Sequence, residues 1–170
     1  MTPNFEGTER FDPARHDISG FDCDNETLDR WLVRYAGQSE RRDAARTFVA
    51  VVDGRAVAAY YTLVAAEVGH EGATEQVGKG MSQQYPIPAA LLARLAVDRR
   101  HQGRGTGSAM LNDALLRVCV AAEQVAVRAV VVHAIDESAA RFYRRFGFRS
   151  LSAASRTLMV TLAELRAAGY

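Results

Sequence analysis

A strand, a glycine-rich turn, a helix and a second strand follow one another in the middle of the chain. Residues 89–97 form an apolar run that predicts a buried strand, and residues 106–122 carry apolar side chains at helical spacing. A second buried strand is predicted over residues 126–134. A unit of this kind places two parallel strands in one sheet. We therefore expect an α/β (α+β) protein with a parallel or mixed sheet flanked by helices.

The flanking segments supply the remaining elements. Asp24 is a plausible N-cap for the first helix, Gly37 is expected to end or weaken it, and Asp53-Gly54 is a strong two-residue hairpin turn. Gly147 suits the position after a helix C-terminus. The expected elements are a helix at 25–40, strands at 47–52 and 56–68, a long loop at 69–88, a helix at 137–146, and closing strands at 148–151 and 157–162.

Length and composition limit the kind of protein this is. A chain of 170 residues with 48% hydrophobic residues is expected to form a single domain over residues 1–170. A net charge of +1 argues against a nucleic-acid binder recruited by bulk charge. Cys23 and Cys119 are too few for a disulfide framework, and the scattered histidines show no metal-ligand spacing. With no signal-like N-terminus and no apolar run long enough for a bilayer, we expect a cytoplasmic protein without a metal.

The turn between the first buried strand and the helix has the composition of a phosphate loop. It reads Arg100-His101-Gln102-Gly103-Arg104-Gly105, with Gly107 behind it. The first turn of a helix has unpaired N–H groups and a partial positive charge, and glycines let the backbone approach an anion closely. Two arginines add charge-assisted contacts. The spacing is not that of G-x-G-x-x-G, and the Gly-Lys-Ser/Thr of a nucleoside triphosphatase is missing. A turn that only joins strand to helix stays open as an alternative.

Three segments in order resemble the GNAT superfamily of acetyl-CoA-dependent N-acetyltransferases. The first is Leu95-Ala96-Val97 with Asp98, which looks like the strand before that family's pyrophosphate loop. The second is Arg100-x-x-Gly103-x-Gly105, and the third runs from His133 through Glu137-Ser138-Ala139-Ala140-x-Phe142-Tyr143 to Gly147-Phe148. The resemblance implies a GNAT fold, with a mixed central sheet of about six or seven strands. It also implies a splay between the two central parallel strands that holds the pantetheine arm.

The resemblance also implies a set of residues for the co-substrate acetyl-CoA. The backbone of Leu95 and Val97 would hold the pantetheine arm, and the glycine-rich loop would surround the diphosphate. Asp136 stands where the family often carries Asn. The complete set is Leu95, Ala96, Val97, Arg100, Gln102, Gly103, Arg104, Gly105, Thr106, Gly107, Ser108, Asp136, Ala139 and Phe142.

Tyr143 matches the tyrosine that commonly protonates the departing thiolate in this family. Attack of an amine on a thioester expels a coenzyme A thiolate, and a phenol of pKa near 10 is still protonated at neutral pH. Ordinary packing beside Phe142 and Phe146 is the alternative for this residue. Cys23 and Cys119 lie in no evident nucleophile arrangement, so direct attack without an acyl-enzyme is expected.

The strand at 89–97 contains no Asp or Glu, and Arg94 is its only ionisable residue. Many GNAT enzymes place a general-base glutamate on this strand. A lysine amine has a pKa near 10.4 and needs a base, whereas an α-amine titrates near 7.7–8.0 and an adjacent ester lowers its pKa further. The missing carboxylate therefore favours a low-pKa amine as the acceptor, although Glu67 or Glu71 can still activate a water.

The closer resemblance is to the TacT-like GNAT toxins of toxin–antitoxin pairs, which acetylate the amino acid on charged tRNA. The matching stretches are Phe21-Asp22-Cys23, Ala59-Tyr60-Tyr61-Thr62-Leu63, Arg94-Leu95-Ala96-Val97-Asp98 and Phe142-Tyr143 with Gly147-Phe148. This resemblance implies an aminoacyl-tRNA substrate, a ribbon-helix-helix-type antitoxin and a homodimer. An acetyltransferase for protein N-termini or small amines, and a non-catalytic acetyl-CoA-binding module, are the alternatives.

Arginines supply the candidate contacts to tRNA. Of the 21 basic residues only Lys79 is lysine, and the arginine fork is suited to phosphate. The candidates for substrate binding are Arg41, Arg42, Arg94, Arg144 and Arg145. A solvated helix face is the alternative for the last two.

Overall fold

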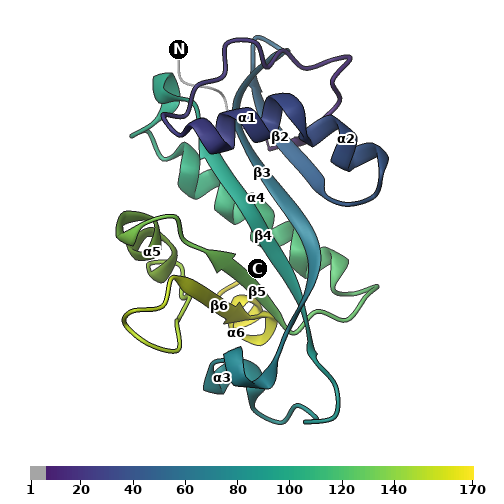
Figure 1. Ribbon diagram of the computed structural model, residues 1–170, viewed down its shortest axis with the longest axis vertical. Helices are drawn as coiled ribbons and strands as arrows, with labels where there is room; N and C mark the ends of the chain where they lie inside the picture. The colour runs from purple at the N-terminus through teal and green to yellow at the C-terminus, as the bar shows by residue number, and fades with distance from the viewer. Residues whose placement is uncertain (1–6) are drawn as a thin grey trace. The chain divides into compact units, whose positions relative to one another are not determined.

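The computed structural model describes residues 7–170 and shows six strands in one mixed sheet (Figure 1). The strands are hydrogen-bonded in chain order, with β4 and β5 parallel and the pairs β1–β2, β2–β3 and β5–β6 antiparallel. The expected α/β class and mixed sheet are confirmed. The strands are β1 (Glu9–Arg10), β2 (Arg46–Val52), β3 (Ala56–Val68), β4 (Ile87–Val97), β5 (Ala129–His133) and β6 (Thr157–Thr161).

The chain forms two compact units, and the single domain expected over residues 1–170 stays a prediction. Unit 1 contains the residues up to Val64 together with Ala93–Ala114, and unit 2 contains Ala65–Leu92 with Leu115–Tyr170. The helices are α1 (Glu26–Arg34), α2 (Ala36–Arg41), α3 (Glu75–Gly78), α4 (Thr106–Ala121), α5 (Glu137–Arg144) and α6 (Leu162–Ala167), with short 3₁₀ turns η1 (His70–Gly72) and η2 (Arg99–His101). β3, β4 and α4 contribute residues to both units.

In unit 1, α1 and α2 cover one face of β2 and β3 (Figure 1). Leu32 of α1 is buried in the same apolar cluster as Tyr60 of β3. The next residue, Tyr61, faces the other side of the sheet, where its hydroxyl donates to Asp113 of α4 at 2.6 Å. Neighbouring side chains on a strand point to opposite faces, so helices on both sides bury both tyrosines completely.

The predicted helix at 25–40 is two helices. The backbone of Tyr35 leaves the helical region, and α2 starts directly after it. Asn25, and not Asp24, is the N-cap of α1: its side chain accepts from the Leu28 N–H at 3.1 Å, whereas Asp24 has φ +65°. Gly37 does not end the helix but lies inside α2, where a Cβ would come within 2.9 Å of Pro13. The glycine therefore permits close packing on the N-terminal segment.

The hairpin of β2 and β3 is confirmed, but its turn is longer than predicted. Val52 pairs with Ala56, so three residues connect the strands. Asp53 and Gly54 both have positive φ, and the Arg55 N–H donates to the Val52 carbonyl at 3.2 Å. The extra residue accompanies a register shift between Ala50 and Val51.

Unit 2 is built around β4, β5 and β6. Ile87, Ala129, Val131 and Met159 form its apolar core, and α3, α5 and α6 contact β6. β5 pairs with β4 from Ala89–Ala129 to Leu92–Val132. The long loop expected at 69–88 is partly ordered as η1 and α3, because the Arg128 guanidinium donates to carbonyl oxygens of this segment at 3.0–3.1 Å.

One prediction at the C-terminal end is wrong, and one helix there was not predicted. Residues 148–151 form no strand and contribute only an isolated bridge between Arg149 and Met159. The structure instead adds α6, whose start is a capping box: Thr161 accepts from the Glu164 N–H at 3.1 Å, and Glu164 accepts from the Thr161 N–H at 2.9 Å. Thr-x-x-Glu is a recognisable sequence signal for a helix start. The helix predicted over 137–146 ends earlier, at Arg144, and Gly147, with φ +91°, lies in the turn that follows it.

Candidate functional site

The glycine-rich loop leads directly into α4, as the sequence predicts. Gly103 and Gly105 have φ of +72° and +80°, a left-handed conformation that other residues adopt only with strain. The Gly105 carbonyl accepts the first helical hydrogen bond, from the Ala109 N–H at 3.0 Å. The N–H groups of residues 106–108 belong to the first turn and have no acceptor within the helix. Three amide donors and the positive end of a 16-residue helix therefore face the same point.

A buried carboxylate fixes the start of this loop. Asp98 is 1% exposed, and its two oxygens accept from the Arg100 N–H and Nε at 2.9 Å, from Arg100 Nη2 at 3.0 Å and from the Asp22 N–H at 3.0 Å. Burial raises the pKa of Asp98, but these hydrogen bonds outweigh burial and hold the pKa at about 2. Asp98 is therefore an anion that ties η2 to the segment before α1.

Two residues assigned to acetyl-CoA hold the loop to that same segment. Arg100 Nη2 also donates to the Gly20 carbonyl at 3.2 Å, which leaves Nη1 to face outward. The Gln102 amide nitrogen donates to the Val97 and Cys23 carbonyls at 2.8 and 3.2 Å. These side chains shape the loop, and the backbone is the part of it best placed for a ligand.

A hollow of about 390 Å³ adjoins the loop on the side of the β2–β3 hairpin. Arg100, His101 and Arg104 line it, together with Val52, Asp53, Ala56 and Val57. Burial lowers the pKa of His101, whose buried Nδ1 has no hydrogen-bond partner among residues 7–170. His101 was not among the predicted site residues, because the sequence of the loop does not show which residues surround its side chain.

Arg94 of β4 lies on the α1 side of the sheet in unit 1. Its guanidinium carbon is 4.0 Å from the centre of the Trp31 ring, and Trp31 in turn stacks on Tyr60 with ring centres 6.1 Å apart. Burial lowers the pKa of the half-buried guanidinium, but arginine remains charged. Trp31 was missed as a site residue, because an aromatic residue at helical spacing is more often part of a core.

Tyr143 is placed by α5 in unit 2. Asp136 is the N-cap of this helix, and its side chain accepts from the Ala139 N–H at 2.8 Å. The Tyr143 ring packs edge-on against Phe142 and lies at a tilt to Phe148, with ring centres 5.2 and 5.6 Å away. Burial raises the pKa of Tyr143 to about 12. The phenol therefore keeps its proton at every physiological pH, as a proton donor must.

The comparison with protein families decides what kind of chain this is. A model described as the acetyltransferase (GNAT) domain matches residues 43–150, which include the loop, Arg94 and Tyr143. The chain belongs to the GNAT family. This confirms the resemblance on which the residue assignments rest.

Several proteins similar to this chain are named as toxins. A tRNA-acetylating toxin of Mycobacterium tuberculosis (strain ATCC 25618 / H37Rv) is 37% identical over 151 residues, which cover 89% of each chain. The structure of AtaT complexed with acetyl-methionyl-tRNAfMet superposes with a TM-score of 0.85 at 26% identity and covers 96% of this chain and 98% of that one. A tyrosine-to-phenylalanine mutant of AtaT, bound to the C-terminus of the antitoxin AtaR and acetyl-CoA, gives a TM-score of 0.79 at 25% identity, covering 95% and 96%.

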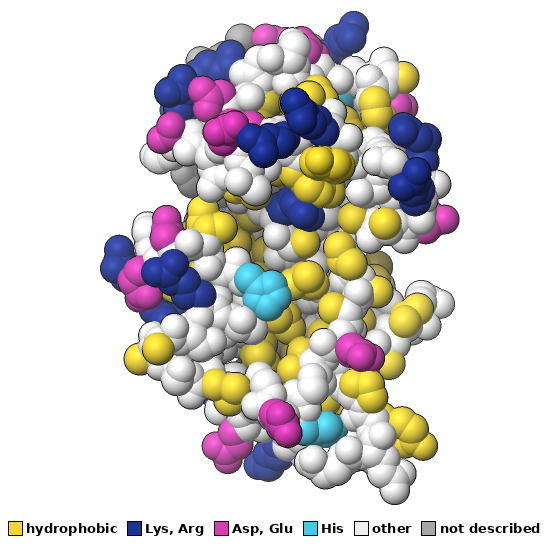
Figure 2. All heavy atoms as spheres, in the orientation of Figure 1, with side chains coloured by type: hydrophobic (Ala, Val, Ile, Leu, Met, Phe, Trp, Pro, Cys, Tyr) yellow, Lys and Arg dark blue, Asp and Glu magenta, His cyan; other side chains and the backbone are white. Residues whose placement is uncertain are grey.

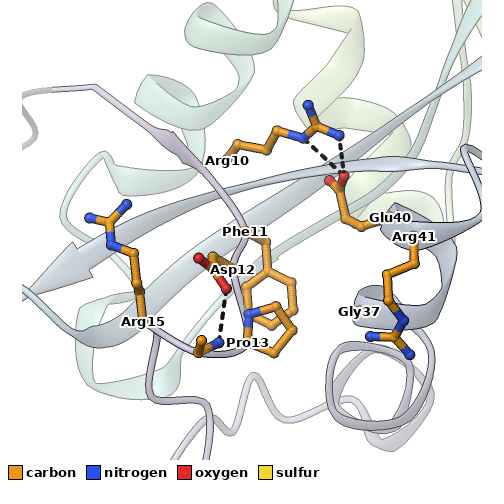
Figure 3. Close-up of a pocket in the computed structure, with 9 residues that line it drawn as sticks. Arg10, Phe11, Asp12, Pro13, Arg15, Gly37, Glu40 and Arg41 are labelled. Atoms are coloured by element: carbon orange, nitrogen blue, oxygen red, sulfur yellow. Dashed lines mark hydrogen bonds and ion pairs between the residues drawn. The ribbon is translucent and has the colours of Figure 1, made fainter.

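The remaining arginines predicted to bind substrate lie at the end of α2 and at the end of α5. Arg41, at the end of α2, lines a hollow of about 650 Å³ with Arg10 and Arg15. In Figure 3 the Arg41 side chain extends past Gly37. Arg10 is paired with Glu40 there, at 2.8 Å. Arg42 faces the side-chain amide of Gln38.

Arg144 and Arg145 lie at the end of α5 and differ in their surroundings. Arg144 donates to Glu137 at 2.8 Å, and Figure 2 shows basic and acidic side chains together over this helix. Arg145 lies 5.8 Å from the centre of the Phe142 ring. The Glu137 ion pair reduces the charge that Arg144 offers to an anion.

Over residues 7–170, none of the helices combines the length and apolar character needed to cross a bilayer. No group of three or more His, Cys, Asp or Glu side chains in that range is arranged to hold a metal ion.

Proposed function

We propose that this protein transfers the acetyl group of acetyl-CoA to the α-amine of aminoacyl-tRNA and thereby blocks translation. One observation carries the choice of acceptor: β4, where many GNAT enzymes hold a general-base glutamate, contains Arg94 and no carboxylate. An esterified α-amine needs little or no base at neutral pH. The similarity to a tRNA-acetylating toxin and to AtaT with its acetylated tRNA supports the same acceptor.

The loop fits acetyl-CoA as the co-substrate. Gly103 and Gly105 carry no side chain, and a Cβ built on either meets nothing of residues 7–170 within 4 Å, so this part of the chain leaves the loop backbone open to an approaching diphosphate. The first-turn amides of α4 supply hydrogen bonds without a counter-charge. In this proposal the backbone of Leu95 and Val97 holds the pantetheine arm. The side chains of Arg104 and Ser108 complete the surroundings of the diphosphate.

Direct attack is favoured over an acyl-enzyme. Burial raises the pKa of Cys23 to about 12 and also raises the pKa of Cys119, so neither thiol is a ready nucleophile. The neutral amine attacks the thioester carbonyl, a C–N bond forms, and the C–S bond breaks. Tyr143 donates its proton to the departing sulfur and regains one from the amine nitrogen. The products are an N-acetyl-aminoacyl-tRNA and a free thiol, with no net gain or loss of protons.

The partners follow from the same similarity. We propose that residues 1–170 form a single acetyltransferase domain and that the protein is a homodimer. A ribbon-helix-helix-type antitoxin would neutralise it. The AtaT structure with the C-terminus of AtaR supports a peptide-like contact by the antitoxin.

The test is transfer from radiolabelled acetyl-CoA to charged tRNA. Bulk aminoacyl-tRNA should become labelled, whereas deacylated tRNA and a peptide with a free N-terminus should not. Label on the peptide alone would replace this proposal with a protein N-acetyltransferase. No transfer to any acceptor, with acetyl-CoA still bound, would indicate a non-catalytic module.

A further inference from the structure

The Arg94 guanidinium is the outer layer of a stack with Trp31 and Tyr60. Arg94 and Ala96 point to the same face of β4, and Ala96 belongs to the apolar cluster that contains Trp31 and Tyr60. The Tyr60 hydroxyl donates to the Leu28 carbonyl at 2.7 Å, which fixes the innermost ring. Trp31 lies on that ring at an interplanar angle of 14°, and the guanidinium lies on Trp31. Cation–π attraction holds the guanidinium over the face of the indole.

Within residues 7–170, this guanidinium has no hydrogen-bond acceptor and no acidic partner, although it is half-buried. Arg100 in the loop and Arg46 in the sheet each have an acidic partner: Arg100 is bonded to Asp98, and Arg46 to Asp43 and Glu40. Removing a cation from water without pairing it is unfavourable. A stacked, partly desolvated cation with five unused N–H donors is therefore an anion site, and the fork geometry suits a phosphate or carboxylate that it can bind with two hydrogen bonds.

The surroundings favour the phosphate of a single-stranded nucleic acid. Arg34 lies one turn after Trp31 on α1 and is exposed, and acidic residues of α1 lie in its first turn. Figure 2 shows basic and apolar side chains over α1 and α2, with acidic ones beside them over α1. Proteins that hold single strands combine aromatic rings, guanidinium planes and positive charge in this way. The acceptor end of tRNA is single-stranded, so its last phosphates are free to enter such a site.

We propose that Arg94, stacked on Trp31, binds the last internucleotide phosphate of the aminoacyl-tRNA acceptor end. The inference rests on the proposed function. Arg94 directly precedes Leu95, whose backbone is proposed to hold the thioester arm, so the phosphate bound there is the one nearest the aminoacyl ester. Arg94 is thus a positioning residue for the acceptor: it sets where the terminal nucleotide lies and takes no part in proton transfer.

Two small acceptor substrates show whether Arg94 acts on the phosphate or on the reaction in general. The first is an aminoacyl-adenosine, which has no phosphate. The second is the corresponding aminoacyl-cytidylyl-adenosine, which carries one phosphodiester, and both bear the amino acid that the wild type acetylates best on tRNA. The wild type should use the dinucleotide with a kcat/KM about ten- to a hundredfold higher, the range expected for a hydrogen bond to a charged group.

Arg94→Gln should lose that advantage. Its kcat/KM for the dinucleotide should fall about ten- to a hundredfold, while its kcat/KM for the nucleoside should stay within about threefold of the wild type. Arg94→Lys keeps the charge but not the fork, so it should recover part of the loss. Arg149→Gln is the matched control, because Arg149 is exposed, is paired with Glu164 and belongs to no part of the proposed site; it should behave like the wild type.

The outcomes are distinguishable. A wild type that uses both acceptors equally, or an Arg94→Gln variant that loses activity equally with both, overturns the phosphate site while charged tRNA is still acetylated. A wild type that does not acetylate charged tRNA overturns the proposed function, and the assignment of Arg94 falls with it. Circular dichroism melting of each variant shows whether a loss of activity reflects unfolding.

Discussion

Replacing Asp98 with Asn tests whether one buried carboxylate holds the diphosphate loop in place. The carboxylate accepts four hydrogen bonds, and an Asn amide keeps only one oxygen. If that oxygen stays with the Arg100 N–H and Nε, the new NH₂ group faces two donors, the Asp22 N–H and Arg100 Nη2. Each lost bond to a charged group is worth about 1.5–3 kcal/mol. The Arg100 side chain is 67% exposed, so water replaces part of its share. We expect Asp98→Asn to lower the free energy of unfolding by about 2–4 kcal/mol at pH 7.

The pKa of Asp98 gives a second route to the magnitude. A change in this pKa from its ordinary value of 3.8 to about 2 on folding corresponds to about 2 kcal/mol. Because the folded-state pKa is the lower one, this stability is complete above about pH 5 and is lost as pH falls through 3.8 toward 2. The difference in unfolding free energy between wild type and Asp98→Asn should therefore shrink by about 2 kcal/mol over that window.

Urea unfolding, followed by the fluorescence of Trp31, measures both quantities between pH 7 and the lowest pH at which the proteins fold. Asp24→Asn is the control, because Asp24 is exposed and Asn tolerates its left-handed backbone. Calorimetric titration with coenzyme A should show weaker binding for Asp98→Asn only. A difference below about 1 kcal/mol at pH 7, or one that does not shrink in acid, would refute the reasoning.

Three further predictions concern the proposed site. Tyr143→Phe keeps the buried ring but not the hydroxyl, so the melting temperature and acetyl-CoA affinity should persist while turnover falls about 10²–10⁴-fold; full activity would remove Tyr143 as the acid. Gly105→Ala places a Cβ at φ +80° and should cost about 1–2 kcal/mol in stability and weaken coenzyme A binding, and unchanged binding would contradict the backbone cradle. The double variant Arg144→Gln and Arg145→Gln should weaken tRNA binding and flatten its dependence on salt, with acetyl-CoA affinity intact; an unchanged salt slope would argue against phosphate contacts on α5.

The sequence predicted most helices and strands that are marked by one uninterrupted hydrophobic pattern. β4, α4 and β5 lie within a few residues of their predicted bounds, because an apolar run or a helical period marks each of them. The break at Tyr35 was not predictable in this way, since the apolar spacing of α1 continues past it. The break depends on how α2 packs on Pro13, a contact between segments more than twenty residues apart. Long-range packing of this kind leaves no local pattern.

In the candidate site, too, local backbone features were predictable and long-range contacts were not. Positive φ at Gly103 and Gly105 follows from residue type, so the loop was predictable as a loop. The partners of its side chains were not: Arg100 was assigned to a phosphate, yet most of its donors go to Asp98 and Gly20. Asp98 itself was noted only as the residue after a strand. A sequence shows which residues have donors, but the fold decides where those donors are used.

Arg94 and the missing carboxylate on β4 select for the same acceptor. Without a general base, an amine that is mainly ammonium at neutral pH has few reactive molecules, which disfavours lysine, of pKa near 10.4. A guanidinium without an acidic partner adds repulsion to that ammonium, a few kcal/mol at separations of about 4–6 Å in a partly buried site. The neutral amine of an aminoacyl ester meets neither obstacle, and its neighbouring phosphate is attracted by the same charge. In the proposed function, β4 therefore disfavours lysine side chains and favours charged tRNA, without a carboxylate of its own.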